Sequence, residues 1–145
     1  MIPKSLLLAL IAGVSGAGIL GVYFESLNPQ DIEYVQGSAI SLLVEKRDFK
    51  MGETIPISII NSGTSQIVFS SDLPSLRIRA LDGTVFFSAN FDGVKLDPNE
   101  KYIYDWTQQK NDSSKISEGR YVVDSFGHDA EHREIADSVI INIIK

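Results

Sequence analysis

The feature that most limits what this chain can fold into is a run of 20 residues without a charged side chain, Ser5 to Phe24. A helix of this length rises about 30 Å, which matches the hydrocarbon thickness of a bilayer. Lys4 precedes the run and Glu25 follows it, so a charged residue lies at each end. We therefore predict a transmembrane signal-anchor helix over residues 5–24, in contact with membrane lipid.

The orientation of this segment follows from Lys4, because basic residues flanking a membrane helix favour the cytoplasmic side. The C-terminal part of the chain is then outside the cytoplasm, and the protein is predicted to be a single-pass protein of the cell membrane. A cleaved signal peptide is the alternative, since Ser15-Gly16-Ala17 resembles a small-residue cleavage site. Cleavage there would leave an apolar N-terminus over residues 18–24, which favours the uncleaved anchor.

Small residues recur every four positions along the predicted helix and so share one face. They are Ala9, Gly13, Ala17 and Gly21. Such a face lets membrane helices approach closely and gain packing contacts. We expect it to pack against another helix, either in a homo-oligomer or in a larger membrane complex, with a generic anchor as the alternative.

The rest of the chain divides into a linker over residues 25–38 and a β domain over residues 39–145. The linker contains Asn28-Pro29 and Gly37 and has no sustained apolar period. In the domain, apolar residues alternate with polar ones over short segments separated by turn residues, which is typical of β-strands. The predicted strands cover residues 39–44, 54–60, 66–70, 76–80, 84–87, 101–107, 120–126 and 138–144.

About eight strands with frequent turns favour an all-β fold, an immunoglobulin-like antiparallel β-sandwich, with a small closed barrel as the second choice. Asp82-Gly83 predicts a tight hairpin. Tyr121 near the start of a strand predicts a tyrosine corner, in which the hydroxyl bonds back to the chain. The strand over residues 138–144 is apolar on both faces, so we expect it to be covered on both sides.

Two groups of side chains on the predicted strands have more than one interpretation. Tyr102, Tyr104 and Trp106 share one strand face and form either part of the core or an exposed aromatic binding face. Arg77 and Arg79 share the face opposite the apolar residues of their strand, and we expect that face to be solvated.

Two stretches of the domain resemble the BsuPI family, named after an intracellular proteinase inhibitor of Bacillus. They are Leu96 to Trp106 and Ile116 to Tyr121, whereas Phe49 to Ile57 with Asn61-Ser62-Gly63 resembles the opening of many prokaryotic immunoglobulin-like modules. The resemblance covers roughly residues 40–145 and its motifs are a turn, a sheet tryptophan and a Gly-x-Tyr strand start. It implies an immunoglobulin-like domain and, as a possible activity, protease inhibition.

Composition excludes several functional classes. The net charge is −6 and no basic cluster is present, which argues against nucleic-acid binding. The chain has no cysteine, so it has no disulfide, thiolate metal site or cysteine nucleophile. It also lacks a Gly-x-Ser-x-Gly motif and a glycine-rich phosphate loop. We therefore predict a protein that is not an enzyme and that carries no cofactor.

Two local motifs remain as candidate sites. His128 and His132 are four residues apart, a spacing that would let them share Zn²⁺ or Cu²⁺ on a helix; a solvated polar loop is the alternative. Asn111-Asp112-Ser113 is a glycosylation sequon.

These observations lead to one main functional hypothesis and two alternatives. The main hypothesis is a membrane-anchored extracytoplasmic domain that binds other membrane protein subunits, as an accessory or structural component of a larger complex. The alternatives are a BsuPI-type protease inhibitor and a metal-binding sandwich that uses His128 and His132.

Overall fold

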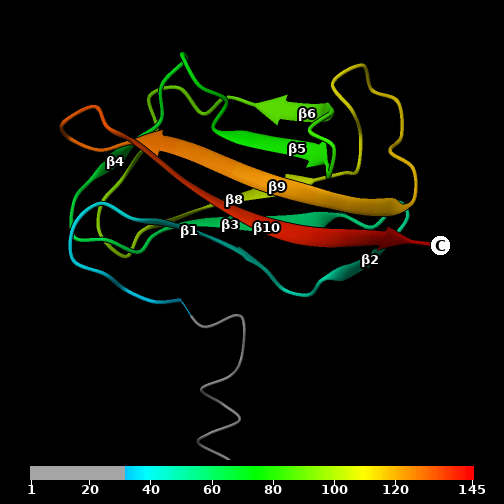
Figure 1. Cartoon of the computed structure of the whole chain (residues 1–145), viewed down its shortest axis with the longest axis horizontal. Helices are drawn as coiled ribbons and strands as arrows, with labels where there is room; N and C mark the ends of the chain where they lie inside the picture. The colour runs from blue at the N-terminus through cyan, green and yellow to red at the C-terminus, as the bar shows by residue number, and fades with distance from the viewer. Residues whose placement is uncertain (1–31) are drawn as a thin grey trace, which may run out of the picture. The chain divides into compact units, whose positions relative to one another are not determined.

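The computed structural model describes residues 32–145, which form a β-sandwich (Figure 1). These residues contain strands and no helix. The strands are β1 (Ile40–Val44), β2 (Asp48–Lys50), β3 (Ile55–Asn61), β4 (Ile67–Val68), β5 (Leu76–Ala80), β6 (Val85–Ala89), β7 (Lys95–Leu96), β8 (Lys101–Trp106), β9 (Gly119–His128) and β10 (Glu134–Ile144). The predicted all-β sandwich is confirmed for this part of the chain.

The strands form two sheets. The smaller sheet has the order β1-β3-β8. The larger one begins with β2-β10-β9 and then divides, because β9 pairs both with β4, which β7 follows, and with β5, which β6 follows. The longest pairing joins β9 and β10, from His128↔Glu134 to Gly119↔Ile143. The pairing of β10 with β2 is parallel, whereas the other strand pairs in residues 32–145 are antiparallel. The predicted antiparallel pairing therefore holds for these strands except at this one pair.

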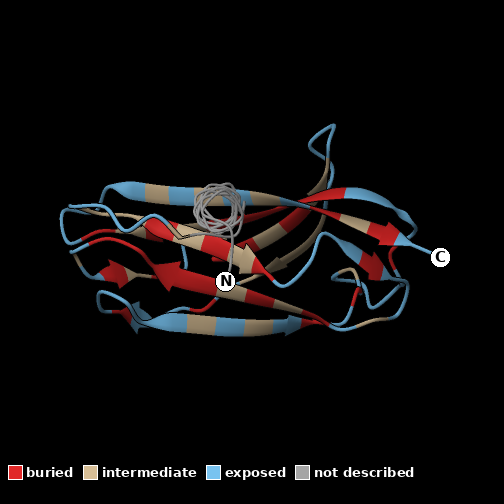
Figure 2. Cartoon of the chain, turned by 90° about the horizontal axis from the view of Figure 1, so that it is seen from below, coloured by how far each residue is buried: buried red, intermediate tan, exposed pale blue. Residues whose placement is uncertain are grey.

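The core lies between the two sheets, because the inward-facing residue of each strand is apolar. Ile55, Ile57 and Ile59 are fully buried along β3, and Trp106 at the end of β8 is buried as well. In Figure 2, buried segments concentrate in the middle of the molecule, and alternating exposed and intermediate segments mark strands at its rims. Burying each such side chain stabilises the fold by roughly 1.5–3 kcal/mol.

Two predicted local features are confirmed. Asp82-Gly83 forms the turn between β5 and β6, and Gly83 has a φ of 95°, in the left-handed region that favours glycine. The hydroxyl of Tyr121 donates to the carbonyl oxygen of Ser117 at 2.7 Å. This bond ties the start of β9 to the loop that precedes it, as a tyrosine corner does.

The last strand differs from its prediction in length and in burial. β10 begins at Glu134 rather than at residue 138, and it pairs with β9 over that added length. One of its faces is buried through Ile141 and Ile143, but Ile140 and Ile144 on the other face are 45% and 44% exposed. The expectation that both faces are covered is therefore wrong within residues 32–145.

Loops gather at the two opposite ends of the sandwich, and the candidate sites lie among these loops. At the linker end, residues 35–39 bond to the loop over residues 61–66, and the β9–β10 loop over residues 129–133 lies beside them. At the far end are the turns over residues 51–54 and 81–84, the loop over residues 107–118 and the C-terminus. Figure 1 shows the β9–β10 loop and the C-terminus at opposite ends of β10.

The predicted membrane helix over residues 5–24 lies outside the described residues, as does the first half of the predicted linker, residues 25–31. Within residues 32–145, no helix has the length and apolarity needed to cross a membrane.

Candidate functional site

The two histidines lie together at the linker end, where they line one cavity of about 350 Å³. Its wall is formed by Val68, Ser70, Asp72, His128, Asp129, Ala130 and His132. β4 and the last residue of β9 supply one side of this cavity, and the β9–β10 loop supplies the other. The sequence prediction that His128 and His132 share a site is compatible with this placement.

His128 is held by two side chains of the segment that follows β4. Its Nδ1 lies 3.1 Å from Ser70 Oγ, and its Nε2 lies 3.7 Å from Asp72 Oδ2. Ser70 Oγ also donates to the Asp72 carboxylate. That bond lowers the pKa of Asp72, and the nearby imidazole of His128 lowers it further. Ser70 Oγ is thereby bonded both to the imidazole of His128 and to the carboxylate of Asp72.

His132 belongs to a tight turn and not to a helix. Its φ is 60°, and its backbone N–H donates to the carbonyl oxygen of Asp129 at 3.0 Å. The Asp129 carboxylate shapes this turn by accepting bonds from the backbone N–H groups of Glu131 and Arg133, both at 2.9 Å, and from Ser38 Oγ at 2.9 Å. These bonds, led by the one from Arg133, lower the pKa of Asp129 to about 2.

The geometry gives a metal ion few ligands in this cavity. Within residues 32–145, no group of three or more His, Cys, Asp or Glu side chains gathers closely enough to hold a metal ion. The helical face that the spacing of His128 and His132 requires is replaced by a hairpin loop. The metal site therefore stays a prediction, without a third ligand from this part of the chain.

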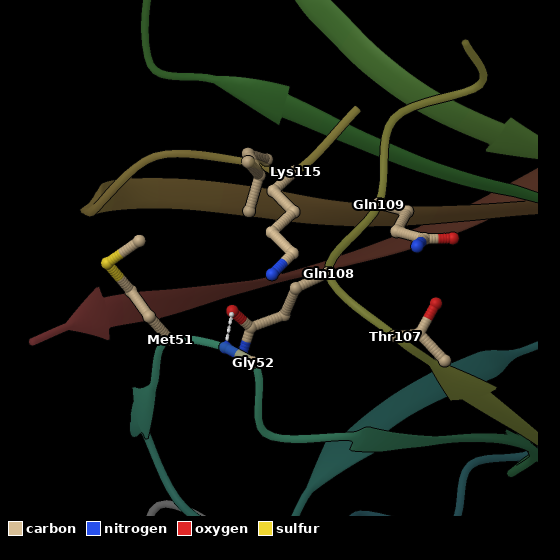
Figure 3. Close-up of a pocket in the computed structure, with 7 residues that line it drawn as sticks. Met51, Gly52, Thr107, Gln108, Gln109 and Lys115 are labelled. Atoms are coloured by element: carbon tan, nitrogen blue, oxygen red, sulfur yellow. Dashed lines mark hydrogen bonds between the residues drawn. The ribbon is translucent and has the colours of Figure 1, made fainter. Parts of the chain in front are cut away.

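A second cavity, of about 240 Å³, lies at the far end (Figure 3). Gln108 lies on its wall with a φ of 58°, and it is buried. Its amide oxygen accepts from the N–H of Gly52 at 3.0 Å, and its amide nitrogen donates to the carbonyl oxygens of Lys50 and Glu53, both at 2.8 Å. Gln108 thus fixes the turn over residues 51–54 against the loop over residues 107–118, and both N–H groups of its amide serve this purpose.

A buried carboxylate on the outer face of the larger sheet is a feature that the sequence pattern did not predict. Asp124, at the middle of β9, is 3% exposed and accepts from Arg77 Nη2 at 2.8 Å and from Arg79 Nε at 2.7 Å. Ser138 Oγ donates to the same carboxylate at 2.6 Å. The expectation of a freely solvated face at Arg77 and Arg79 is therefore wrong. A single Asp within the apolar strand over residues 120–126 was the signal in the sequence.

The predicted glycosylation residue has a structural position. Asn111 Oδ1 accepts from the N–H of Ser88 at 2.8 Å, and Asn111 Nδ2 donates to the carbonyl oxygen of the same residue at 2.9 Å. The side chain thereby pairs with the outer edge of β6 much as a neighbouring strand would. Its use as a glycosylation site stays a prediction.

The aromatic side chains of β8 lie mostly inside the sandwich. Trp106 is buried, and its Nε1 donates to the carbonyl oxygen of Gln109 at 2.9 Å. The rings of Tyr102 and Tyr104 pack on Phe91, with centroids 4.6 and 5.5 Å away. These contacts favour the core over the aromatic binding face. The helix face of Ala9, Gly13, Ala17 and Gly21 lies outside the described residues.

Comparison with known proteins gives distant structural likenesses only. No family model and no curated protein matches this chain. Among solved structures, the sporulation control protein Spo0M from Bacillus subtilis is 12% identical, with a TM-score of 0.43 over 77% of this chain. This chain spans about half of that protein, 51% of its length.

Two further structures show weaker likeness. A β-glucosidase from Listeria innocua is 12% identical and has a TM-score of 0.37, over 74% of this chain and 16% of the enzyme. A conjugate transposon protein from Bacteroides vulgatus is 15% identical and has a TM-score of 0.33, over 79% of this chain and 91% of that one. At such TM-scores these likenesses add no argument about function.

Proposed function

We propose that this chain is a single-pass membrane protein whose β-sandwich lies outside the cytoplasm and binds another protein there. It serves as an accessory or structural subunit of a larger membrane complex. The uncharged run over residues 5–24 supports the anchor, and the small-residue face of Ala9, Gly13, Ala17 and Gly21 supports contact with another membrane helix.

The observation that carries the proposal is the exposed apolar surface at the far end of the sandwich. Met51, Leu81, Val85 and Ile144 are 44–58% exposed there. Leu81 and Val85 flank the β5–β6 turn, and the N–H of Met51 donates to the carbonyl oxygen of Ile144 at 2.8 Å. Exposed apolar surface marks protein–protein or membrane interaction sites or ligand-binding grooves, and we infer a protein-binding surface from these two pairs of side chains. This end is also the one opposite the residues through which the linker joins the domain.

The sandwich is, in our proposal, immunoglobulin-like. The order β1-β3-β8 fits strands A, B and E of that fold, and the order β10-β9-β5-β6 fits strands G, F, C and C′. The bond from Tyr121 to Ser117 at the start of β9 lies where the tyrosine corner of strand F lies. The tryptophan departs from the pattern, since Trp106 is on β8 and not on the strand that fits C.

The resemblance to BsuPI inhibitors offers less support for an inhibitory activity. The residues that carry it include Trp106 and Tyr121, which are buried and serve the fold. Residues 96–101 turn the chain between β7 and β8, and the N–H of Glu100 donates to the carbonyl oxygen of Asp97 at 3.0 Å. No described contact selects one loop as an inhibitory loop, so protease inhibition stays a prediction.

A site-specific photocrosslinking experiment in native membranes tests the proposed function. A photoreactive amino acid at Leu81 or Val85 should give one discrete crosslinked band, and the same probe at Ile140 on the sheet face should not. The band should weaken at least tenfold when the probe at Val85 is combined with Leu81→Ser. Membrane fractions should retain the chain after an alkaline wash, because a helix over residues 5–24 resists extraction.

Two results would refute the proposal. Extraction of the full-length chain by the alkaline wash would show that residues 5–24 do not anchor it in the membrane. Crosslinking that is equal at Val85 and Ile140, or absent at both, would show that the far end of the sandwich is not a specific protein-binding surface.

A further inference from the structure

The strand β8 forms an edge of the smaller sheet, and among the described residues, 32–145, it pairs only with β3. The N–H of Asn61 donates to the carbonyl oxygen of Glu100 at 3.0 Å, so the odd-numbered residues of β3 point their backbone groups toward β8. Since these groups alternate in an antiparallel pair, the backbone groups of Lys101, Ile103 and Asp105 point away from β3. Nothing within residues 32–145 pairs with them.

The other edges of the sandwich are short or covered. The outward N–H of Leu42 on β1 donates to Asp137 Oδ2 at 2.8 Å, and the edge of β6 is occupied by the side chain of Asn111. The edge strands β2 and β7 have three and two residues. Protection of this kind is usual, because an open edge strand is a template for pairing with another chain. β8 lacks it over six residues.

The exposed side chains of β8 are complementary in charge to those of the same strand in a second copy of the chain. Lys101, Ile103 and Asp105 are exposed on its outer face, and Ile103 is 51% exposed. Within the described chain, neither Lys101 nor Asp105 has an ion-pair partner. Four residues of extended strand separate the two charges by about 13 Å, which is too far for them to pair with each other.

We propose that two copies of this chain pair through β8 in antiparallel orientation, about a two-fold axis at Ile103. Lys101 of each copy then faces Asp105 of the partner subunit, and Ile103 faces Ile103 of the partner subunit. Each of these pairs exchanges two backbone hydrogen bonds, which satisfies the open edge groups. The two three-stranded sheets become one six-stranded sheet.

The charges of Lys101 and Asp105 favour a second copy of this chain as the partner, and they favour one register of the two strands. Shifting the strands by two residues would set each charge opposite Ile103 or beyond the strand, and would leave both charges unpaired. The two-fold arrangement also uses up the open edge of both copies, so it closes as a dimer and does not extend into a fibre. This inference concerns the β domain alone and does not depend on the proposed membrane function.

A charge-exchange experiment on the full-length chain in mild detergent tests this pairing, with sedimentation velocity as the readout. The unmodified chain should be a dimer. K101D and D105K should each raise the dimer dissociation constant at least tenfold, because like charges then face each other at two positions. An equimolar mixture of K101D and D105K should form a heterodimer, since every charge again faces its opposite. The double variant K101D/D105K should dimerise as the unmodified chain does.

The controls separate this contact from folding and from association through the predicted membrane helix. Fluorescence of the single tryptophan, Trp106, should be the same in all variants, because both substituted positions are exposed. A monomeric unmodified chain at high micromolar concentration would overturn the proposal. Single variants that dimerise as well as the unmodified chain would place the contact elsewhere, and a mixture that stays monomeric would overturn the register.

Discussion

Replacing Asp124 by asparagine removes a buried charge from the middle of β9 while keeping the shape of the side chain. The carboxylate is 3% exposed, and it accepts from Arg77 Nε at 3.0 Å and from Arg79 Nε at 2.7 Å. Burial by itself raises the pKa of Asp124, but the hydrogen bonds from Arg79, Ser138 and Arg77 outweigh burial and hold that pKa below its usual value. The partners therefore keep the group charged.

The expected loss of stability in D124N follows from the number of groups that bond to Asp124 and from how exposed those groups are. Hydrogen bonds to charged groups contribute about 1.5–3 kcal/mol each, and breaking a buried ion pair costs about 3–5 kcal/mol. These values do not add, and the side chains of Arg77 and Arg79 are 31% and 27% exposed, so both regain water when the charge is lost. We expect D124N to lower the free energy of unfolding by about 3 kcal/mol, the low end of the range for a buried pair.

The assay is urea unfolding of the full-length chain in mild detergent, followed by tryptophan fluorescence. The chain has one tryptophan, Trp106, and its side chain is buried in the sandwich, so the signal reports this domain. The slope of the unfolding free energy against urea should be unchanged. The matched control is D92N, at an exposed aspartate in the loop before β7, which should stay within about 0.5 kcal/mol of the unmodified chain.

Two further measurements, unfolding at low pH and a double-mutant cycle, test whether the charge of Asp124 is responsible for the stability that D124N loses. Since the folded-state pKa of Asp124 is lowered, its contribution is present above the unfolded pKa of about 3.9 and is lost as the pH falls through the folded-state value. The difference between D124N and the unmodified chain should thus shrink in acid. R79Q and D124N should show a coupling of about 1–2 kcal/mol. A loss below about 1 kcal/mol, zero coupling, or a difference that grows in acid would refute the reasoning.

Three other substitutions have defined outcomes in the same urea assay. Y121F removes the 2.7 Å bond to the carbonyl four residues earlier and should cost about 1 kcal/mol. N111A frees both backbone groups of Ser88 and should cost about 0.5–1.5 kcal/mol, with faster amide exchange along β6. G127A brings a Cβ to 2.8 Å from Ile67 Cγ2 and should cost about 1–3 kcal/mol. An unchanged unfolding midpoint in any of the three would contradict the contact assigned to that residue.

All eight predicted strands exist in the structure, and each has a local signal in the sequence. Ile55, Ile57 and Ile59 alternate because one face of β3 is buried, and this pattern can be found without knowing what covers it. The tight turn at Asp82-Gly83 is equally local. By contrast, β2 and β7 contain three and two residues and exist through pairing with β10 and β4, which no local pattern reveals.

The candidate sites likewise combine features that a local sequence pattern predicts with features that depend on contacts between distant parts of the chain. The spacing of His128 and His132 predicted their proximity, but the turn held by Asp129 decides the geometry of the pair. The cluster around Asp124 depends on the register that sets Arg77 opposite it, across 47 residues of sequence. Register between distant strands is fixed by the packed core and the turns together, so a list of charged residues does not contain it.

Asp129 gives a prediction that links the β9–β10 loop to pH. Hydrogen bonds from the backbone N–H of Arg133, from Ser38 and from the guanidinium of Arg133 outweigh burial and lower the pKa of Asp129 to about 2. A group with a lowered folded-state pKa stabilises the fold above its unfolded value and loses that contribution as the pH falls through the folded one. The loop should therefore stay closed from pH 7 to about pH 4 and open between about pH 4 and pH 2.

The carboxyl ¹³C shift of Asp129 measures this directly, and its titration midpoint should lie about 2. Amide exchange of Glu131 and Arg133, whose N–H groups donate to this carboxylate, should accelerate over the same pH interval. D129N should show the faster exchange already at pH 7, whereas E131Q, at an exposed residue of the same loop, should not. A midpoint near the unperturbed 3.8 would mean that these bonds do not hold the loop. The cavity that His128 and His132 line would then lack the fixed wall that its geometry requires.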